Sequence, residues 1–176
     1  MISTSAVTST STLVIGYGNP LREDDGAGWR AAELLEARLS PDAAEIIQCH
    51  QLTPELADRL GQAWVVVFLD AACDQEPGVV SAAPVQPEEA GAWSHQLSPG
   101  QLLTLTKQLT GRAPPAFLIR GGALRMGLGE KLTESGERAA VQMAEAAQAL
   151  LTGRRGGNPA GLNGPTSSFQ ADRMAN

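Results

Sequence analysis

The fold is decided near the start of the chain, where residues 12–28 read TLVIGYGNPLREDDGAG. The first four residues form a short apolar run that ends at a glycine, as expected for a buried strand leading into a loop. The glycines at positions 16 and 18 let the backbone turn sharply and approach another group closely. Three acids follow, directly before residues 28–39, whose apolar spacing predicts a helix. The segment therefore predicts strand, tight turn and helix, with carboxylates at the turn.

The rest of the chain repeats this alternation. Apolar runs predict further strands at residues 44–49, 64–69, 78–85 and 116–119. Cap and proline signals predict helices that start near Thr53 and Ser98, and a last helix is predicted from Thr133. The alternation predicts an α/β fold, a three-layer α/β/α sandwich with a largely parallel central sheet. The strand at residues 78–85 is bounded by prolines, which favours an antiparallel edge strand.

Length and composition limit the chain to one domain. It has 176 residues, of which 43% are hydrophobic and 18% charged, enough for a single core. Residues 12–151 are predicted to form this domain. Residues 1–11 are expected to be a disordered lead-in, and residues 152–176 a disordered tail rich in glycine and proline.

Charge and hydropathy exclude several function classes. The formal net charge of −6 argues against a nucleic-acid partner, which requires clustered lysine and arginine. The longest apolar run, residues 63–69, is far shorter than the ~20 residues that a membrane-spanning helix needs. Residues 1–11 have no basic start and no apolar core, so they do not resemble a secretory signal. The expected protein is a cytoplasmic monomer without membrane contact.

The two cysteines, Cys49 and Cys73, form no C-x-x-C pair and no disulfide framework. Each follows an apolar run, so both are expected to be buried, reduced thiols. Neither has the local surroundings of a catalytic nucleophile.

Acidic side chains follow two of the predicted strands, where ligands bind in open α/β sheets. Asp24 and Asp25 precede the first helix, and Asp70 directly follows residues 64–69. One of the first two, more readily Asp24, can cap the helix and leave the other to face the crevice. Asp70 is costly to bury without a partner, which favours a functional role over a turn cap.

Two histidines could complete such a site. His95 precedes the helix predicted from Ser98, and His50 follows the second strand. Two carboxylates and an imidazole from three loops fit a divalent metal of borderline hardness, such as nickel or zinc. A loop histidine is also often only a surface residue. The residues alone indicate an α/β protein with a metal or acid–base site.

The G-x-G-N turn at residues 16–19, followed by DDGAG at residues 24–28, resembles the signature of hydrogenase maturation proteases. The FLDA run at residues 68–71 and the histidine-bearing segment at residues 94–99 resemble the second and third motifs of that family. The resemblance covers residues 12–151. It implies an endopeptidase that removes the C-terminal extension of a nickel–iron hydrogenase large-subunit precursor after nickel insertion.

The resemblance also implies roles for individual residues. The nickel belongs to the substrate, and its implied ligands are Asp25, Asp70 and His95, the two aspartates also being catalytic. The implied substrate-binding loop contains Gly18, Asn19 and Asp24. Some relatives place the histidine after Ser-Pro, where this chain has Gly100, so His50 is a reserve ligand. The attacking water could be activated by the metal or by a carboxylate.

Other functions remain open at this point. A nickel-sensing checkpoint or chaperone that holds the precursor without cutting it would use the same features. Peptidyl-tRNA hydrolase also has a G-x-G-N-P turn, as at residues 16–20, but its Thr-Arg-His-Asn run is missing and the acidic charge disfavours tRNA. A dinucleotide-binding turn would need a third glycine where Leu21 stands.

Overall fold

A computed structural model describes residues 12–88 and 97–153 of the chain. Its five strands form one sheet in the order β2-β1-β3-β5-β4. The strands are β1 (Thr12–Tyr17), β2 (Glu45–Cys49), β3 (Val65–Ala72), β4 (Val80–Val85) and β5 (Ala116–Gly122). The first three and β5 are parallel, and β4 runs antiparallel to β5 at the edge. The predicted α/β fold with an antiparallel edge strand is confirmed.

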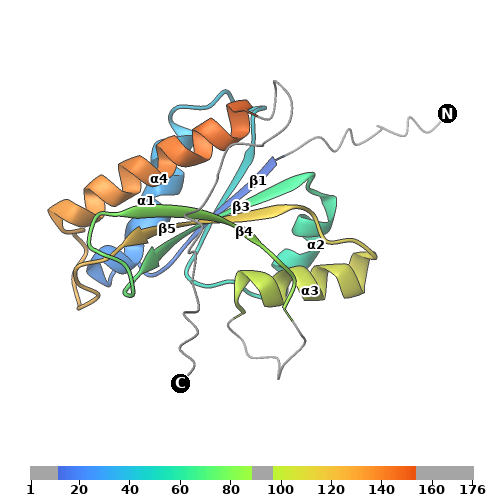
Figure 1. Cartoon of the computed structure of the whole chain (residues 1–176), viewed down its shortest axis with the longest axis horizontal. Helices are drawn as coiled ribbons and strands as arrows, with labels where there is room; N and C mark the ends of the chain where they lie inside the picture. The colour runs from blue at the N-terminus through green and yellow to red at the C-terminus, as the bar shows by residue number, and fades with distance from the viewer. Residues whose placement is uncertain (1–11, 89–96, 154–176) are drawn as a thin grey trace, which may run out of the picture.

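Helices cover both faces of the sheet (Figure 1). They are a 3-10 turn η1 (Glu23–Gly26), α1 (Ala27–Glu36), α2 (Leu56–Gln62), α3 (Pro99–Thr110) and α4 (Glu134–Gly153). Helices α1 and α4 pack on one face, and α2 and α3 on the other. Alternate residues of β3 serve the two cores: Val67 packs with the α1 and α4 side, and Phe68 with the α2 and α3 side. The central strand is therefore apolar on both faces, as the sequence predicts.

Of the two predicted helix caps, the one at Ser98 is formed and the one at Thr53 is not. Ser98 Oγ accepts a hydrogen bond from Gln101 N at 3.1 Å, and Gln101 Oε1 accepts one from Ser98 N at 2.9 Å, which forms a capping box. Thr133 Oγ1 accepts from Gly136 N at 3.1 Å at the start of α4. The predicted Thr53 cap is wrong: its carbonyl closes a turn with Leu56 N at 3.1 Å, and α2 begins only at Leu56.

The capping box allows a first prediction. Ser98→Ala removes the acceptor for Gln101 N and should lower the free energy of unfolding by about 1 kcal/mol. Urea unfolding followed by circular dichroism measures the change, with Ser40→Ala, an exposed loop residue between α1 and β2, as the control. Equal midpoints for the two variants would contradict the cap's contribution.

The ends of the domain and the cysteines differ in part from expectation. The predicted lead-in at residues 1–11 lies outside the described residues, as does the tail from residue 154, but Thr152 and Gly153 belong to α4. Both cysteines are free, Cys49 is partly buried and Cys73 is exposed. The burial prediction is wrong for Cys73 because β3 ends at Ala72 and the thiol lies in the following turn. Within the described ranges, no helix is long and apolar enough to span a membrane.

Candidate active site

The first turn of α1 lies directly against the two central strands. A Cβ atom at Gly28 would be 2.6 Å from the carbonyl oxygen of Tyr17 and closer still to that of Leu69. A Cβ atom at Gly16 would overlap the carbonyl oxygen of Gly28 in turn. Only glycine permits this approach. It brings the residues before α1 to the carboxyl ends of β1 and β3.

This close approach predicts a large effect for a small substitution. Gly28→Ala should destabilise the protein by about 1–3 kcal/mol, because the methyl group forces α1 away from backbone atoms that cannot yield. Thermal unfolding measures the loss. Gly153→Ala is the control, since a Cβ atom there meets nothing within 4 Å. Similar melting temperatures for the two variants would argue against the tight helix–strand contact.

The segment from residue 18 to residue 26, here named the acid turn, positions Asp25. The backbone N–H of Asn19 donates to Asp25 Oδ2 at 3.2 Å, and Asn19 Oδ1 accepts from Leu21 N at 2.9 Å. Gly18 has a φ of 130°, and a side chain there would overlap the carbonyl oxygen of Asp25. The G-x-G-N turn thus wraps around Asp25, whose side chain stays partly exposed.

Asp70 lies inside β3 and not after it. The strand continues to Ala72, and Asp70 pairs in register with Arg120 of β5. The predicted strand end is wrong because β5 extends equally far and prolongs the ladder. Asp70 remains at the carboxyl edge of the sheet, beside the acid turn.

The surroundings of Asp70 change its acidity. Burial raises the pKa of Asp70 to about 6, against a lowering by the Tyr17 hydroxyl, which donates a hydrogen bond, and by the Arg120 guanidinium. The negative charge of Asp25 raises this pKa further, so the two carboxylates are close enough to repel each other. The structure therefore brings together the two aspartates that the sequence selected.

Tyr17 and Arg120 belong to this site but were not among the predicted residues. Burial and then the charge of Asp70 raise the pKa of Tyr17, so its hydroxyl remains protonated. Arg120 donates to both carboxylate oxygens of Asp74, at 3.2 and 2.5 Å. Two signals were available: Tyr17 is the only tyrosine of the chain, and Arg120 directly follows the apolar run of β5.

Asp24 has a different role from its neighbour. Its side chain has 0% exposure and accepts four hydrogen bonds, from Thr133 N and Oγ1 at 2.7 Å each, Leu124 N at 2.9 Å and Arg125 N at 3.3 Å. Burial alone would raise the pKa of Asp24, but these bonds together lower it. Neither η1 nor α1 has a side-chain cap, so the predicted cap on the first helix is wrong. Asp24 instead fastens the acid turn to the start of α4.

Glu23 fastens the same segment from the other side. Its backbone has a φ of 49°, and its N–H donates to Gly129 O at 2.8 Å. Its carboxylate accepts from Gly127 N at 3.1 Å and pairs with Arg125 at 3.4 Å. Two of the three consecutive acids therefore hold the loop between β5 and α4. Of the three, Asp25 alone is among the groups whose charge shifts the pKa of Asp70.

The histidines are not part of the described pair. His95 lies outside the described residues, so its role as a ligand remains a prediction. His50 is exposed and packs edge to face on Trp29, with ring centroids 5.2 Å apart. Among residues 12–88 and 97–153, no three His, Cys, Asp or Glu side chains gather as a metal site would require. His50 is thus not gathered with Asp25 and Asp70.

These features define an α/β protein with a pair of carboxylates at the carboxyl edge of its parallel sheet. Such a pair can hold a cation, and a carboxyl group with a pKa near 6 can also accept a proton at neutral pH.

Solved structures with the same fold identify the relatives. A [NiFe] hydrogenase maturation protease from Thermococcus kodakarensis is 25% identical with a TM-score of 0.64, over 81% of this chain and 93% of that one. A hydrogenase 2 maturation peptidase from a Thaumarchaeota archaeon is also 25% identical, with a TM-score of 0.62 over 81% and 99%. The hydrogenase maturating endopeptidase HybD of Escherichia coli is 24% identical with a TM-score of 0.69, over 82% and 94%.

The resemblance predicted from the sequence motifs is confirmed by these structures: hydrogenase maturation proteases share the fold of this chain. No family profile matches the sequence, and no curated protein matches it.

Proposed function

We propose that the protein is a cytoplasmic, monomeric endopeptidase that removes the C-terminal extension of a nickel–iron hydrogenase large-subunit precursor. The observation that carries the proposal is the pairing of Asp25 and Asp70 in a fold shared with hydrogenase maturation proteases. The nickel is supplied by the substrate and serves as the recognition element, so cleavage follows nickel insertion.

The site residues have distinct roles in this proposal. Asp25 and Asp70 bind the nickel of the bound precursor, and His95 is the third ligand. The turn at Gly18 and Asn19 lies beside Asp25 and receives the peptide backbone. Asp24 does not contact the peptide in this scheme, because its side chain is buried and holds the acid turn in place.

Hydrolysis needs only water as a second reactant. A water oxygen attacks the carbonyl carbon of the scissile bond, and the C–N bond breaks as a proton reaches the leaving amine. The nickel can polarise the carbonyl or acidify the water. Alternatively, Asp70, which is largely ionised at neutral pH, takes the water proton as a general base.

Coexpression tests the proposal. A nickel-loaded large-subunit precursor is produced with the protein, without it, and with the Asp25→Asn variant, and its intact mass is measured. A single C-terminal truncation that requires the unaltered protein supports the endopeptidase. Stable binding with an unchanged mass would contradict it and favour the nickel-sensing checkpoint, which holds the precursor uncut.

A further inference from the structure

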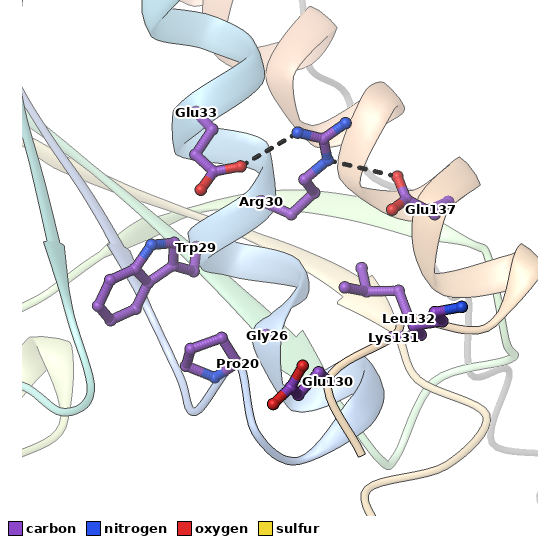
Figure 2. Close-up of a pocket in the computed structure, with 9 residues that line it drawn as sticks. All are labelled: Pro20, Gly26, Trp29, Arg30, Glu33, Glu130, Lys131, Leu132 and Glu137. Atoms are coloured by element: carbon purple, nitrogen blue, oxygen red, sulfur yellow. Dashed lines mark hydrogen bonds and ion pairs between the residues drawn. The ribbon is translucent and has the colours of Figure 1, made fainter.

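A pocket adjoins the acid turn on the side of α1 and α4 (Figure 2). Its volume is about 370 Å³, enough for one long side chain and part of its backbone. Gly26, which directly follows Asp25, forms part of its wall. The pocket is separate from the carboxylate pair, and the proposed hydrolysis does not use it.

The walls of the pocket are apolar on opposite sides. Trp29 and Pro20 lie on one side, and Leu132 faces them from the segment before α4 (Figure 2). The ring of Trp29 also contacts the ring of His50 in a T-shaped arrangement, at 5.2 Å between centroids. Trp29 is half-buried and lines the pocket, so its indole can contact a long aliphatic or cationic side chain that enters there.

The charges around the pocket do not cancel. Arg30 is engaged by two carboxylates, those of Glu33 at 3.1 Å and Glu137 at 3.5 Å (Figure 2). Glu130 lines the pocket and forms no ion pair within residues 12–88 and 97–153. Lys131 lies across the pocket, beside Leu132 (Figure 2). Carboxylates therefore outnumber cations in the lining, and Glu130 is the one without an ion-pair partner in the described part of the chain.

We propose that this pocket binds an arginine-like cationic side chain of a peptide, stacked on Trp29 with its charge toward Glu130. An aromatic face and a carboxylate together are the groups that recognise a guanidinium. Resting on the proposed function, the peptide is the precursor segment near the cut. Because Gly26 adjoins Asp25, and extended chain advances about 3.3 Å per residue, the side chain would come from a position a few residues from the scissile bond.

The binding is tested without any cleavage. The full chain is titrated with N-acetyl-arginine methylamide and with the citrulline analogue, which has nearly the same shape and no charge. The indole N–H signal of Trp29, assigned with Trp29→Phe, reports the binding by NMR. Arginine should shift this signal with a dissociation constant on the order of 1 mM, and citrulline should bind about two- to fivefold more weakly.

Three variants, each replacing one charged side chain by glutamine, test whether arginine binding changes in the expected direction. Glu130→Gln should weaken arginine binding about two- to fivefold, and Lys131→Gln should strengthen it by a similar factor. Glu145→Gln, an exposed α4 residue outside the pocket, should leave it unchanged. Equal binding of arginine and citrulline, or no shift of the Trp29 signal, would overturn the proposal. The titration measures binding and not cleavage. A negative result would therefore contradict the arginine pocket without contradicting the endopeptidase, and a failed cleavage assay would leave the arginine pocket untouched.

Discussion

Replacing Asp70 by asparagine is expected to abolish cleavage and, at neutral pH, to stabilise the fold. The amide keeps the shape of the side chain but has no charge with which to bind nickel or accept a proton, so the rate should fall about 100-fold or more. Burial raises the pKa of Asp70 from 3.8 to about 6, so the folded protein prefers the neutral form. The ionised carboxylate therefore costs stability that asparagine restores.

The sign of the pH dependence follows from this raised pKa. Stability is lost as pH rises from 3.8 to about 6, because the unfolded chain releases the Asp70 proton first. Above pH 6, Asp70→Asn should be more stable than the original protein by roughly 1–3 kcal/mol, and the difference should vanish near pH 4. Cleavage by the original protein needs the ionised form of Asp70. Its rate should therefore decline as pH falls through about 6.

Urea unfolding at pH 4.5 and pH 8, with cleavage assayed in parallel at pH 8, measures both effects. Asp74→Asn is the matched control, because Asp74 also faces Arg120 but is a largely exposed residue beyond the end of β3. It should retain cleavage and gain no stability at pH 8. Full activity of Asp70→Asn would remove Asp70 from the site.

Asp24→Ala is expected to cause a large loss of stability, about 3–5 kcal/mol at pH 7. The substitution leaves four donors without their acceptor, from Thr133, Leu124 and Arg125. Buried donors without a partner are costly, and those that met a charge are the costliest. Because the pKa of Asp24 is lowered in the fold, its contribution is present above pH 3.8 and is lost as pH falls further.

The control for Asp24→Ala is Asp42→Ala, a substitution of an exposed loop residue that should change stability by less than about 0.5 kcal/mol. Chemical denaturation at pH 7 compares the two variants with the original protein. Asp24→Ala should also slow cleavage, because Asp25 would be displaced. Thr133→Ser keeps the hydroxyl that donates to Asp24, so its losses of stability and of cleavage should both be smaller. A loss at Asp24 no larger than that at Asp42 would contradict the fastening role.

Local signals in the sequence predicted much of the fold. The β1-turn-α1 unit and the Ser98 capping box were predictable because each depends on residues only a few positions apart. The ends of β3 and β5 were not, since Asp70 and Arg120 interrupt the apolar pattern while pairing with each other across the ladder. The backbone hydrogen bonds of the sheet continue through Asp70 and Arg120. The run of apolar residues that predicts a strand from sequence stops at these two positions.

The site was predictable only in part, for a related reason. Asp25 and Asp70 were identifiable because each follows an apolar run that leads to the carboxyl edge of the sheet in an α/β fold. The true partner of Asp24, Thr133, is 109 positions away, and no local spacing indicates that contact. From the sequence, Asp24 was expected to cap the adjacent helix α1. In the structure its carboxylate instead binds Thr133, far along the chain. The Glu130 and Trp29 pocket also joins segments that only the tertiary fold brings together.

The central claim is that the two carboxylates support cleavage of a nickel-bearing precursor. Purified protein would be incubated with nickel-loaded and with nickel-free large-subunit precursor, and intact masses followed over time. We expect one C-terminal truncation of the nickel-loaded form and none of the nickel-free form. Equal truncation of both forms would contradict nickel recognition, and truncation of neither would contradict the endopeptidase itself.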